Sequence, residues 1–371
     1  MNVGFDREIF LLQKYGGVSK YFSSIAQHFI SSQDFGINPV FTFTRSDNEY
    51  LRNLGNFRAQ RKQIRAKGGL STGLTLGPIR SITQTWSGGL NRIKKMDLLH
   101  ATYYRPTFLE RSVATKLAIT IHDFIPEHLG WTGIRNPHIG KKSLANKSDL
   151  IICVSKNTAN ELSEFYGISD ARVKVIPHGV DNFIHHDEFS GLKKFDRPSV
   201  LYVGHRFGYK NFDILPRAIK EVRNFTPDVQ LVLAGPQLEI SEIRKLNEIV
   251  GEKNWKCFTF LSDKELSILY AQSHVHCVTS KMEGFGMTTL ESLAMGTPVI
   301  ANDIEIFREV LADSAIYYSG NTADSLASVI QATLESKKYE EIRKSGIERA
   351  QQFTWERSAL AHAEAYKELL G

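Results

Sequence analysis

Residues 275–301 read VHCVTSKMEGFGMTTLESLAMGTPVIA and contain one complete strand–loop–helix–strand unit. Two short apolar runs, 275–278 and 298–301, enclose a glycine-bearing loop and a helix that stops before Gly296 and Pro298. Short apolar runs bounded by turn residues and separated by a helix are typical of a parallel sheet with crossover helices. The stretch therefore predicts an α/β fold.

The same alternation of short apolar runs and amphipathic segments continues along the chain. The other expected strands are 2–5, 38–43, 97–100, 117–121, 150–154, 173–176, 199–203, 230–234 and 257–261. These are too many for one ordinary sheet, and they fall into two sets on either side of the polar, aperiodic segment 181–197. The sequence therefore predicts two Rossmann-like, doubly wound domains that face each other across a cleft.

The expected domain boundaries follow from this division. They are an N-terminal acceptor-binding domain at 1–182, a linker at 183–197, a C-terminal donor-binding domain at 198–353, and a final helix at 354–371 that crosses back to the N-terminal domain. Ligands of open α/β sheets bind beyond the carboxyl ends of the strands, so we expect the site in the cleft between the domains.

The composition is that of an ordinary globular protein, with 371 residues, 42% hydrophobic and 23% charged. No apolar run is long enough to span a membrane, and the start of the chain does not resemble a signal peptide. The three cysteines are far apart in the sequence, which favours reduced thiols over a disulfide framework. We therefore expect a cytoplasmic protein.

The net charge of +6 is unevenly distributed. Residues 51–95 contain ten Lys or Arg residues and no Asp or Glu. Such a block is either a solvated loop or a surface that attracts phosphates of nucleic acid, anionic lipid or a diphosphate-bearing substrate. It contains only two aromatic residues, Phe57 and Trp86, which argues against nucleic acid.

Three local patterns follow expected strands and could bind a nucleotide. Gly16 and Gly17 precede an expected helix at 19–30, whose N-terminus could hold an anion, although an ordinary turn would read the same. Arg206 and Lys210 lie on a glycine-bearing loop and could clamp a diphosphate, although alone they could be two surface cations. In the opening stretch, Glu283 and Glu291 could bind hydroxyls, and the backbone of the turn at 286–289 could bind a phosphate.

These patterns together resemble the retaining glycosyltransferases of family 4, which have the GT-B fold. The stretch EGFGMTTLE at 283–291 resembles the E-x7-E signature of that family, and the loop VGHRFGYKN at 203–211 resembles its V-G-x-R…K-N loop. Further matches in the same order are FD at 5–6, GGVSKY at 16–21, HD at 122–123, VS at 154–155, IPHGVD at 176–181, FLSD at 260–263 with EL at 265–266, and FTW at 353–355. His178 replaces the usual Asn of the I-P-N-G-V-D motif.

The resemblance implies roles for individual residues. Arg206 and Lys210 would bind the donor diphosphate and offset charge on the leaving nucleotide, Glu283 would hold hydroxyls of the donor sugar, and His122 would contact the transferred sugar. Other donor-binding residues would be Gly16, Gly17, Leu261, Phe285, Gly286, Met287, Thr288 and Glu291, with Glu291 on the ribose. The residues assigned to the acceptor or the membrane are Arg58, Arg61, Lys62, Arg65, Tyr103 and Tyr104.

The resemblance also implies a reaction. A hexose would move from a nucleotide diphosphate sugar to a glycan with retention at the anomeric carbon, and the leaving phosphate would assist deprotonation of the acceptor. The chain contains no Asp-x-Asp triplet and no zinc-like Cys/His spacing, so we expect no metal and no cofactor. Glycosidase chemistry, which needs two carboxylates flanking a sugar bond, fits the two glutamates less well.

The substrates follow from a narrower resemblance to bacterial enzymes of O-antigen and capsule assembly. The YKNF form of the 209–212 loop and the opening of the chain favour a mannosyl- or deoxyhexosyl-transferase that uses a GDP-sugar such as GDP-mannose. The expected acceptor is a lipid-diphosphate-linked glycan at the inner face of the cytoplasmic membrane, with the basic block at 51–95 on anionic lipid and no nucleic acid as partner. The alternative is a nucleotide-sugar epimerase of the same fold, which would act on the donor alone.

Overall fold

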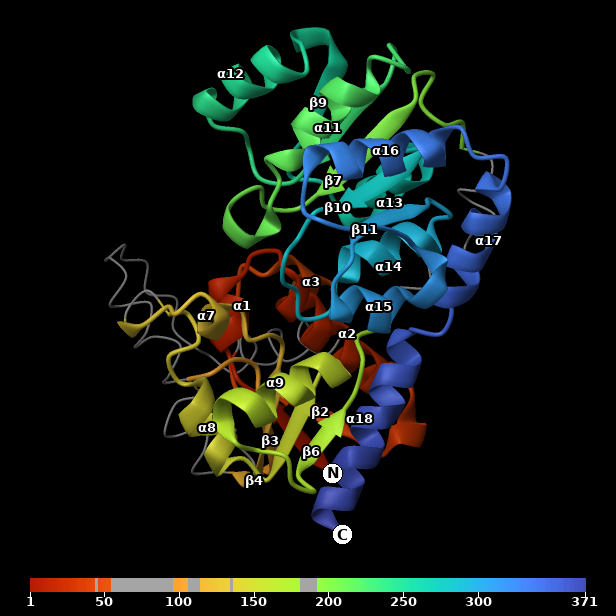
Figure 1. Ribbon diagram of the computed structural model, residues 1–371. Coiled ribbons are helices and arrows are strands. Elements are labelled where there is room, and N and C mark those ends of the chain that lie inside the picture. Colours follow the sequence, from red (N-terminus) through yellow and green to blue (C-terminus); the bar gives the residue numbers. More distant parts are fainter. Residues whose placement is uncertain (44–45, 55–95, 106–113, 134–135, 181–191) are drawn as a thin grey trace, which may run out of the picture. The chain divides into compact units, whose positions relative to one another are not determined.

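The computed structural model describes the chain except for residues 44–45, 55–95, 106–113, 134–135 and 181–191 (Figure 1). The described residues form two compact units. Unit 1 consists of Met1–Gly179 and Trp355–Gly371, and unit 2 consists of Val180–Thr354. Each unit is built around one parallel sheet of six strands.

The sheet of unit 1 has the strand order β2-β1-β3-β4-β5-β6. Its strands are β1 (Asn2–Phe5), β2 (Asn38–Phe41), β3 (Met96–Ala101), β4 (Ala114–Ile121), β5 (Leu150–Cys153) and β6 (Val173–Val175). The helices described in this unit are α1 (Glu8–Leu12), α2 (Gly17–Ser31), α3 (Glu49–Asn53), α7 (Ile125–His128), α8 (Lys141–Lys147), α9 (Lys156–Tyr166) and α18 (Trp355–Leu370), with a 3-10 turn η1 (Gln33–Phe35).

Apolar side chains cover both faces of this sheet. Leu99, Ile119 and Ile151 point to one face and pack with Leu144 of α8 and Leu162 of α9. Helix α18, although it comes from the end of the chain, belongs to unit 1 and packs against α2. Since successive strand residues point to opposite faces, a buried strand must be apolar throughout, as the sequence pattern indicates.

A chain of buried hydrogen bonds fastens α18 and α2 to the sheet. Tyr366 of α18 is 2.6 Å from Nδ1 of His100, whose Nε2 is 2.8 Å from Thr120 Oγ1. Thr120 Oγ1 is in turn 2.9 Å from the hydroxyl of Tyr21, which lies 2.5 Å from Nε2 of His362 on α18. All five side chains are buried, so this polar network is completed within the protein.

The sheet of unit 2 has the order β12-β11-β10-β7-β8-β9. Its strands are β7 (Ser199–Val203), β8 (Gln230–Ala234), β9 (Trp255–Phe258), β10 (Val275–Val278), β11 (Val299–Asn302) and β12 (Ile316–Tyr318). Its helices are α11 (Ile214–Val222), α12 (Ile240–Ile249), α13 (Asp263–Gln272), α14 (Met287–Ala294), α15 (Glu305–Leu311), α16 (Ala323–Leu334) and α17 (Tyr339–Ala350), with 3-10 turns η4 (Gly208–Lys210), η5 (Glu252–Asn254) and η6 (Ala312–Ser314).

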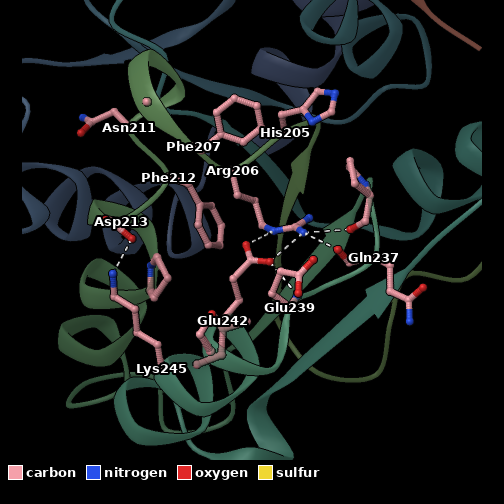
Figure 2. A pocket seen from close by; sticks show the side chains of 15 residues that line it. His205, Arg206, Phe207, Asn211, Phe212, Asp213, Gln237, Glu239, Glu242 and Lys245 are labelled. Atoms are coloured by element: carbon pink, nitrogen blue, oxygen red, sulfur yellow. Dashed lines mark hydrogen bonds and ion pairs between the residues drawn. The ribbon is translucent and has the colours of Figure 1, made fainter. Parts of the chain in front are cut away.

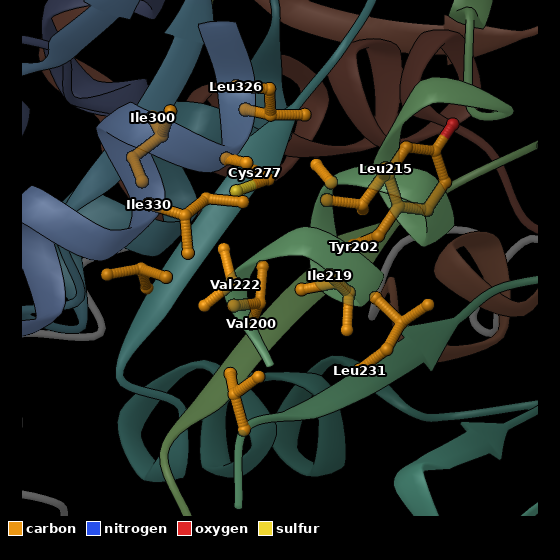
Figure 3. Close-up of a cluster of buried hydrophobic side chains, with 14 of the residues drawn as sticks. Val200, Tyr202, Leu215, Ile219, Val222, Leu231, Cys277, Ile300, Leu326 and Ile330 are labelled. Atoms are coloured by element: carbon orange, nitrogen blue, oxygen red, sulfur yellow. The ribbon is translucent and has the colours of Figure 1, made fainter. Parts of the chain in front are cut away.

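Helices cover both faces of the sheet of unit 2. On one face, Val200 and Leu231 of the strands pack with Leu215 of α11 and Ile330 of α16 (Figure 3). On the other face, Leu201 and Val232, the next residues along β7 and β8, pack with Leu269 and Tyr270 of α13. This alternation confirms the doubly wound arrangement predicted from the sequence.

The structure differs from the expected strands in several places, among them β4, which begins at Ala114, three residues earlier than expected. Strand β9 begins at Trp255, two residues before the expected strand, and β12 was not expected from the sequence. Of the expected linker, residues 183–191 lie outside the described part of the chain. Residues 192–197 pack on unit 2, where Phe195 contacts the α13 side of the core and its amide donates to the carbonyl of Gln272 at 2.9 Å.

Candidate active site

The sheet of unit 2 reverses its strand order between β7 and β10. These two strands pair in parallel, with Val275 opposite Val200, so the loops that follow them lie at the same edge of the sheet. Such a switch point is where open α/β sheets bind ligands. The loops contain the predicted residues Lys210, after β7, and Glu283, after β10.

Lys210 and Glu283 form an ion pair at this switch point. Glu283 also accepts a hydrogen bond of 2.8 Å from Ser280 Oγ. The Lys210 side chain is 22% exposed and that of Glu283 is 14% exposed, so both are shielded but reachable from solvent. A shielded cation beside a hydroxyl-accepting carboxylate can bind an anion and a polyol together.

Helix α14 begins at Met287, four residues after Glu283, and its N-terminal turn depends on Gly286. Gly286 has φ +87°, and a Cβ atom there would lie 2.8 Å from Phe307 Cε1, so only glycine fits. Phe285 is buried, whereas Met287 and Thr288 are partly exposed in the first turn. The amide groups of such a first turn can hold a phosphate.

Glu291 lies one turn further along α14. It is 6% exposed, and its Oε2 accepts a hydrogen bond of 3.2 Å from the hydroxyl of Tyr270 on α13. Burial, and then the charge of Glu291, raise the pKa of Tyr270 well above its ordinary value, so Tyr270 remains a donor. The carboxylate is therefore held in place by α13 near the start of α14.

Arg206 does not join Lys210 and Glu283 in this structure. Its side chain is 6% exposed, and its Nε donates to Glu242 of α12 at 2.8 Å. Its Nη2 donates to the carbonyl oxygens of Pro236 and Gln237, at 2.9 and 3.2 Å. The two cations of the predicted clamp therefore have different partners, and the role of Arg206 at the diphosphate stays a prediction.

His205, which the sequence analysis did not assign to the site, lies near Lys210 and Arg206, and Phe260 of the matched FLSD motif has an unusual backbone. Burial, then the charges of Lys210 and Arg206, lower the pKa of His205, which places its ring in the field of both cations. Phe260, after β9, is 85% exposed and has φ +56°. A bulky residue in the left-handed region is strained, and the same turn contains the predicted donor-binding residue Leu261, which is partly buried.

In unit 1, the loops after β1 and β3 are joined by the buried carboxylate of Asp6. Its Oδ1 accepts from Thr102 Oγ1 at 2.6 Å, and its Oδ2 accepts from the Thr102 amide at 2.9 Å. Gly16 is half-buried and the exposed Gly17 begins α2, as the sequence predicts for a ligand-facing turn. The side-chain oxygen of Gln13 accepts a hydrogen bond of 3.0 Å from the Ser19 amide and so occupies part of the N-terminus of α2.

His122 follows β4 and is 7% exposed. Within the described residues, neither of its ring nitrogens has a hydrogen-bond partner, and its ring stacks on that of His178 with centroids 5.6 Å apart. Burial, and then His178, lower the pKa of His122 well below its ordinary value, so the ring is neutral at pH 7. A neutral ring with both nitrogens unbonded can donate to one ligand oxygen and accept from another.

The predicted acceptor residues are only partly described. Tyr103 is half-buried, but Tyr104 is 2% exposed and packs in the core, where its hydroxyl is 3.5 Å from the His122 amide. Tyr104 therefore supports the His122 loop from within. Arg58, Arg61, Lys62 and Arg65 lie outside the described residues, as does most of the basic block at 51–95.

The described part of the chain contains neither a candidate metal site nor a candidate membrane-spanning helix. It contains no group of three or more His, Cys, Asp or Glu side chains placed to hold a metal ion. In the same part of the chain, none of the helices combines the length and the apolar character needed to cross a bilayer.

Two family models match the chain, one on each half. The model described as Glycosyltransferase Family 4 matches residues 15–182, and the model described as Glycosyl transferases group 1 matches residues 184–353. The chain is 25% identical over 279 residues to O-antigen chain mannosyltransferase B of Escherichia coli, a match that covers 71% of this chain and 72% of that protein. It is 29% identical over 288 residues to an uncharacterized glycosyltransferase of Methanocaldococcus jannaschii, covering 74% and 76%.

Solved structures share the fold over the full length of the chain. Sucrose-phosphate synthase from Thermosynechococcus elongatus has a TM-score of 0.70 at 18% identity and covers 100% of this chain and 99% of its own. Anabaena HepE in complex with UDP and glucose has a TM-score of 0.68 at 18% identity, covering 99% and 100%. The fold class predicted from the sequence, GT-B, is confirmed.

Proposed function

The chain belongs to the glycosyltransferases that join a family 4 N-terminal half to a group 1 C-terminal half, and we propose that it transfers a hexose from a nucleotide diphosphate sugar to a glycan with retention. The observation that carries this proposal is the cluster of Lys210, Glu283 and Ser280 at the switch point between β7 and β10. The cluster offers a cation for the donor diphosphate and a carboxylate for the hydroxyls of its sugar.

The donor would rearrange the cluster as it binds. The Lys210 ammonium, now paired with Glu283, would turn to the diphosphate and offset the charge that develops on the leaving nucleotide. Glu283 would then accept hydrogen bonds from sugar hydroxyls, and Glu291, held by Tyr270, would accept those of the ribose. The amides at the start of α14 would hold a phosphate.

The chemical step needs no covalent intermediate on the protein. The acceptor hydroxyl would attack the anomeric carbon from the face that the nucleotide diphosphate leaves, and a leaving phosphate oxygen would take the hydroxyl proton. The neutral ring of His122, whose nitrogens have no partner among the described residues, would bond hydroxyls of the sugar during transfer. We propose that this step proceeds without a metal ion.

The similarity to an O-antigen chain mannosyltransferase supports mannose as the sugar and a glycan as the acceptor. We propose GDP-mannose as the donor. We further propose that this glycan is carried on a lipid diphosphate, which would place the protein at the inner face of the cytoplasmic membrane. The basic block at 51–95 would supply the contact with anionic lipid, at about 1 kcal/mol for each Lys or Arg near the surface.

A donor screen followed by one matched pair of variants tests the proposal. GDP- and UDP-sugars are screened by thermal shift, and the stabilising donor is then supplied with a lipid-linked glycan acceptor. Lys210→Ala should weaken nucleotide binding in calorimetry by roughly ten- to hundredfold, since a charge-assisted hydrogen bond is worth about 1.5–3 kcal/mol. Lys220→Ala, at an exposed lysine on α11, is the control and should bind as the wild type does.

The reaction products and the effect of a chelator distinguish the proposed reaction from its alternatives. Proton NMR of the product should show the same anomeric configuration as the donor, and an inverted product would contradict retention. Conversion of the sugar nucleotide in the absence of any acceptor would indicate an epimerase instead. Turnover that disappears with a chelator and returns with a divalent ion would contradict metal independence.

A further inference from the structure

Unit 2 contains a pocket of about 650 Å³ that none of Lys210, Glu283 and Glu291 lines (Figure 2). One wall consists of loop residues 205–208 and 211–213 after β7. The other wall consists of residues between 236 and 246, in the loop after β8 and in α12. The volume is in the range of sites that bind small molecules, roughly 300–1,000 Å³.

The loop after β7 separates this pocket from the Lys210–Glu283 cluster. On the cluster side, the carbonyl of Lys210 accepts from Thr279 Oγ1 at 2.7 Å, and the carbonyl of Tyr209 accepts from the Lys281 amide at 2.8 Å. Phe207 and Asn211 of the same loop line the pocket. The pocket is therefore adjacent to the Lys210–Glu283 cluster, and of the two cations predicted to bind the donor diphosphate it contains Arg206 but not Lys210.

Two donor atoms of the pocket residues are buried without a partner. Arg206 uses Nε and Nη2 in the bonds described above, and its Nη1 has no acceptor among the described residues. The amide nitrogen Nδ2 of Asn211 is likewise buried and unbonded. A buried donor without an acceptor costs about 1–3 kcal/mol, so ligand oxygens that reach these two atoms would be favoured.

The charges of the pocket largely cancel. Arg206 is paired with Glu242 at 2.8 Å, and Lys245 with Asp213 at 2.7 Å. The carboxylate of Glu239 caps α12, where it accepts the amide of the third helical residue. With both cations neutralised and a further carboxylate nearby, the pocket does not favour a phosphate or another anion. It suits a neutral ligand rich in oxygen.

The pocket also has an exposed aromatic ring in its lining. Phe207 is 68% exposed and lies against the His205 ring, with centroids 5.4 Å apart. Figure 2 shows both rings beside Arg206. The C–H face of a sugar ring buries apolar area against such an aromatic ring, while its hydroxyls reach polar groups at the edge.

We propose that this pocket binds a neutral oligosaccharide, namely sugar units of the glycan outside the transfer site. The pyranose face would lie on Phe207, and hydroxyl oxygens would accept from Arg206 Nη1 and Asn211 Nδ2. This inference rests on the proposed function, because it takes the occupant to be the substrate glycan. The site would keep the glycan attached between transfers, so its loss should shorten the product.

Direct binding of defined oligosaccharides tests the proposal. Calorimetry and saturation-transfer NMR on the full chain would use an α-linked mannotetraose and maltotetraose as probes, with GDP and UDP measured in parallel. Phe207→Ala should weaken binding of at least one tetrasaccharide about tenfold and leave nucleotide binding unchanged. Phe225→Ala is the matched control, since Phe225 is also 68% exposed but does not line the pocket.

A variant of the nucleotide side makes the outcomes distinguishable. Lys210→Ala should lose nucleotide affinity and keep the tetrasaccharide. No tetrasaccharide binding by the wild type, or equal binding by Phe207→Ala and the wild type, would overturn the proposal. Loss of nucleotide binding in Phe207→Ala would also overturn the proposal, because it would indicate that the pocket binds the nucleobase. If the proposed function fails instead, no nucleotide sugar supports transfer while tetrasaccharide binding still depends on Phe207.

Discussion

Lys210 and Glu283 are 73 positions apart in the sequence, and they meet because β7 and β10 are neighbours in the sheet. Each is positioned by bonds that a random surface residue would lack. The carbonyl of Lys210 is held by Thr279, and the carboxylate of Glu283 by Ser280. These contacts hold the backbone of Lys210 and the carboxylate of Glu283 before the donor binds, so donor binding requires only that the Lys210 ammonium turns to the diphosphate.

Removing the charge of Glu283 and removing that of Glu291 should affect nucleotide binding and turnover in different ways. Glu283→Gln should spare binding of the free nucleoside diphosphate and reduce turnover with the sugar nucleotide, because Glu283 is proposed to bind the sugar. Glu291→Gln should weaken binding of both ligands, by roughly ten- to hundredfold, since ribose is present in both. Calorimetry with the nucleoside diphosphate and steady-state kinetics with the sugar nucleotide measure the two effects.

Glu248→Gln, at an exposed position of α12, is the control for loss of one carboxylate and should change neither measurement. The same profile of losses in Glu283→Gln and Glu291→Gln would contradict the division of roles.

At the scale of elements, the turn that begins α14 determines where both glutamates lie. The turn depends on one glycine, Gly286, which has a left-handed backbone and has Phe307 of α15 against its α-carbon. Gly320 offers a comparison within the same unit, because it has the same φ of +87° but no atom within 4 Å of its added Cβ.

Gly286→Ala should therefore destabilise unit 2 more than Gly320→Ala does. The backbone strain common to both should cost about 1–2 kcal/mol of unfolding free energy. Gly286→Ala should cost about 1 kcal/mol beyond that, because Phe307 must move in a packed interior. Urea unfolding followed by circular dichroism measures both variants, and equal losses would show that the contact with Phe307 does not constrain the turn.

At the scale of the whole molecule, unit 1 encloses a group of buried histidines from four distant segments. His100, His122, His178 and His362 come from β3, the loop after β4, the loop after β6 and α18. Burial is the main cause that lowers the pKa of His178 to about 3 and that of His362 to about 4, and it lowers those of the other two well below the ordinary value. All four are neutral in the folded protein at pH 7.

The stability of unit 1 should therefore fall with acid. The unfolded chain takes up protons near pH 6.5, whereas the folded chain does so only near pH 3–4 at His178 and His362. Their contribution is complete above pH 6.5 and is lost as the pH falls toward 4. Each such histidine contributes a slope of about 1.4 kcal/mol per pH unit in this window.

His178→Asn tests this dependence with the residue that is usual in the resembled motif. Between pH 6 and 4, the unfolding free energy of the variant should fall less steeply than that of the wild type, by about 1.4 kcal/mol per pH unit. Urea unfolding at a series of pH values measures the slopes. Parallel slopes for the two proteins would contradict the assignment of the acid sensitivity to this group.

The elements whose patterns are local were predicted well. Strands β1, β7, β8 and β10 lie at the residues that the sequence indicates, because each is a short apolar run bounded by turn residues. Strand β12 (Ile316–Tyr318) was not expected, because its sequence IYY lacks the alternation of β-branched and polar residues that the equally short β6 shows with VKV. Strand β9 begins at Trp255 because it pairs with β8, and that pairing is a contact beyond the local pattern.

The sequence by itself determined that the chain is an α/β protein of two halves. It also determined which loops contain Lys210, Glu283 and the glycine turns, and which helix contains Glu291. These features are local, since strand and helix periodicity and glycine at a positive φ are set by neighbouring residues. Only the tertiary structure decided which of these residues meet. Arg206 and Lys210 are four positions apart, yet Arg206 bonds Glu242 of α12 and Lys210 bonds Glu283. The reason is that partners so far apart in the sequence are selected by strand order and by the direction in which a loop side chain leaves the backbone, which a sequence pattern does not contain.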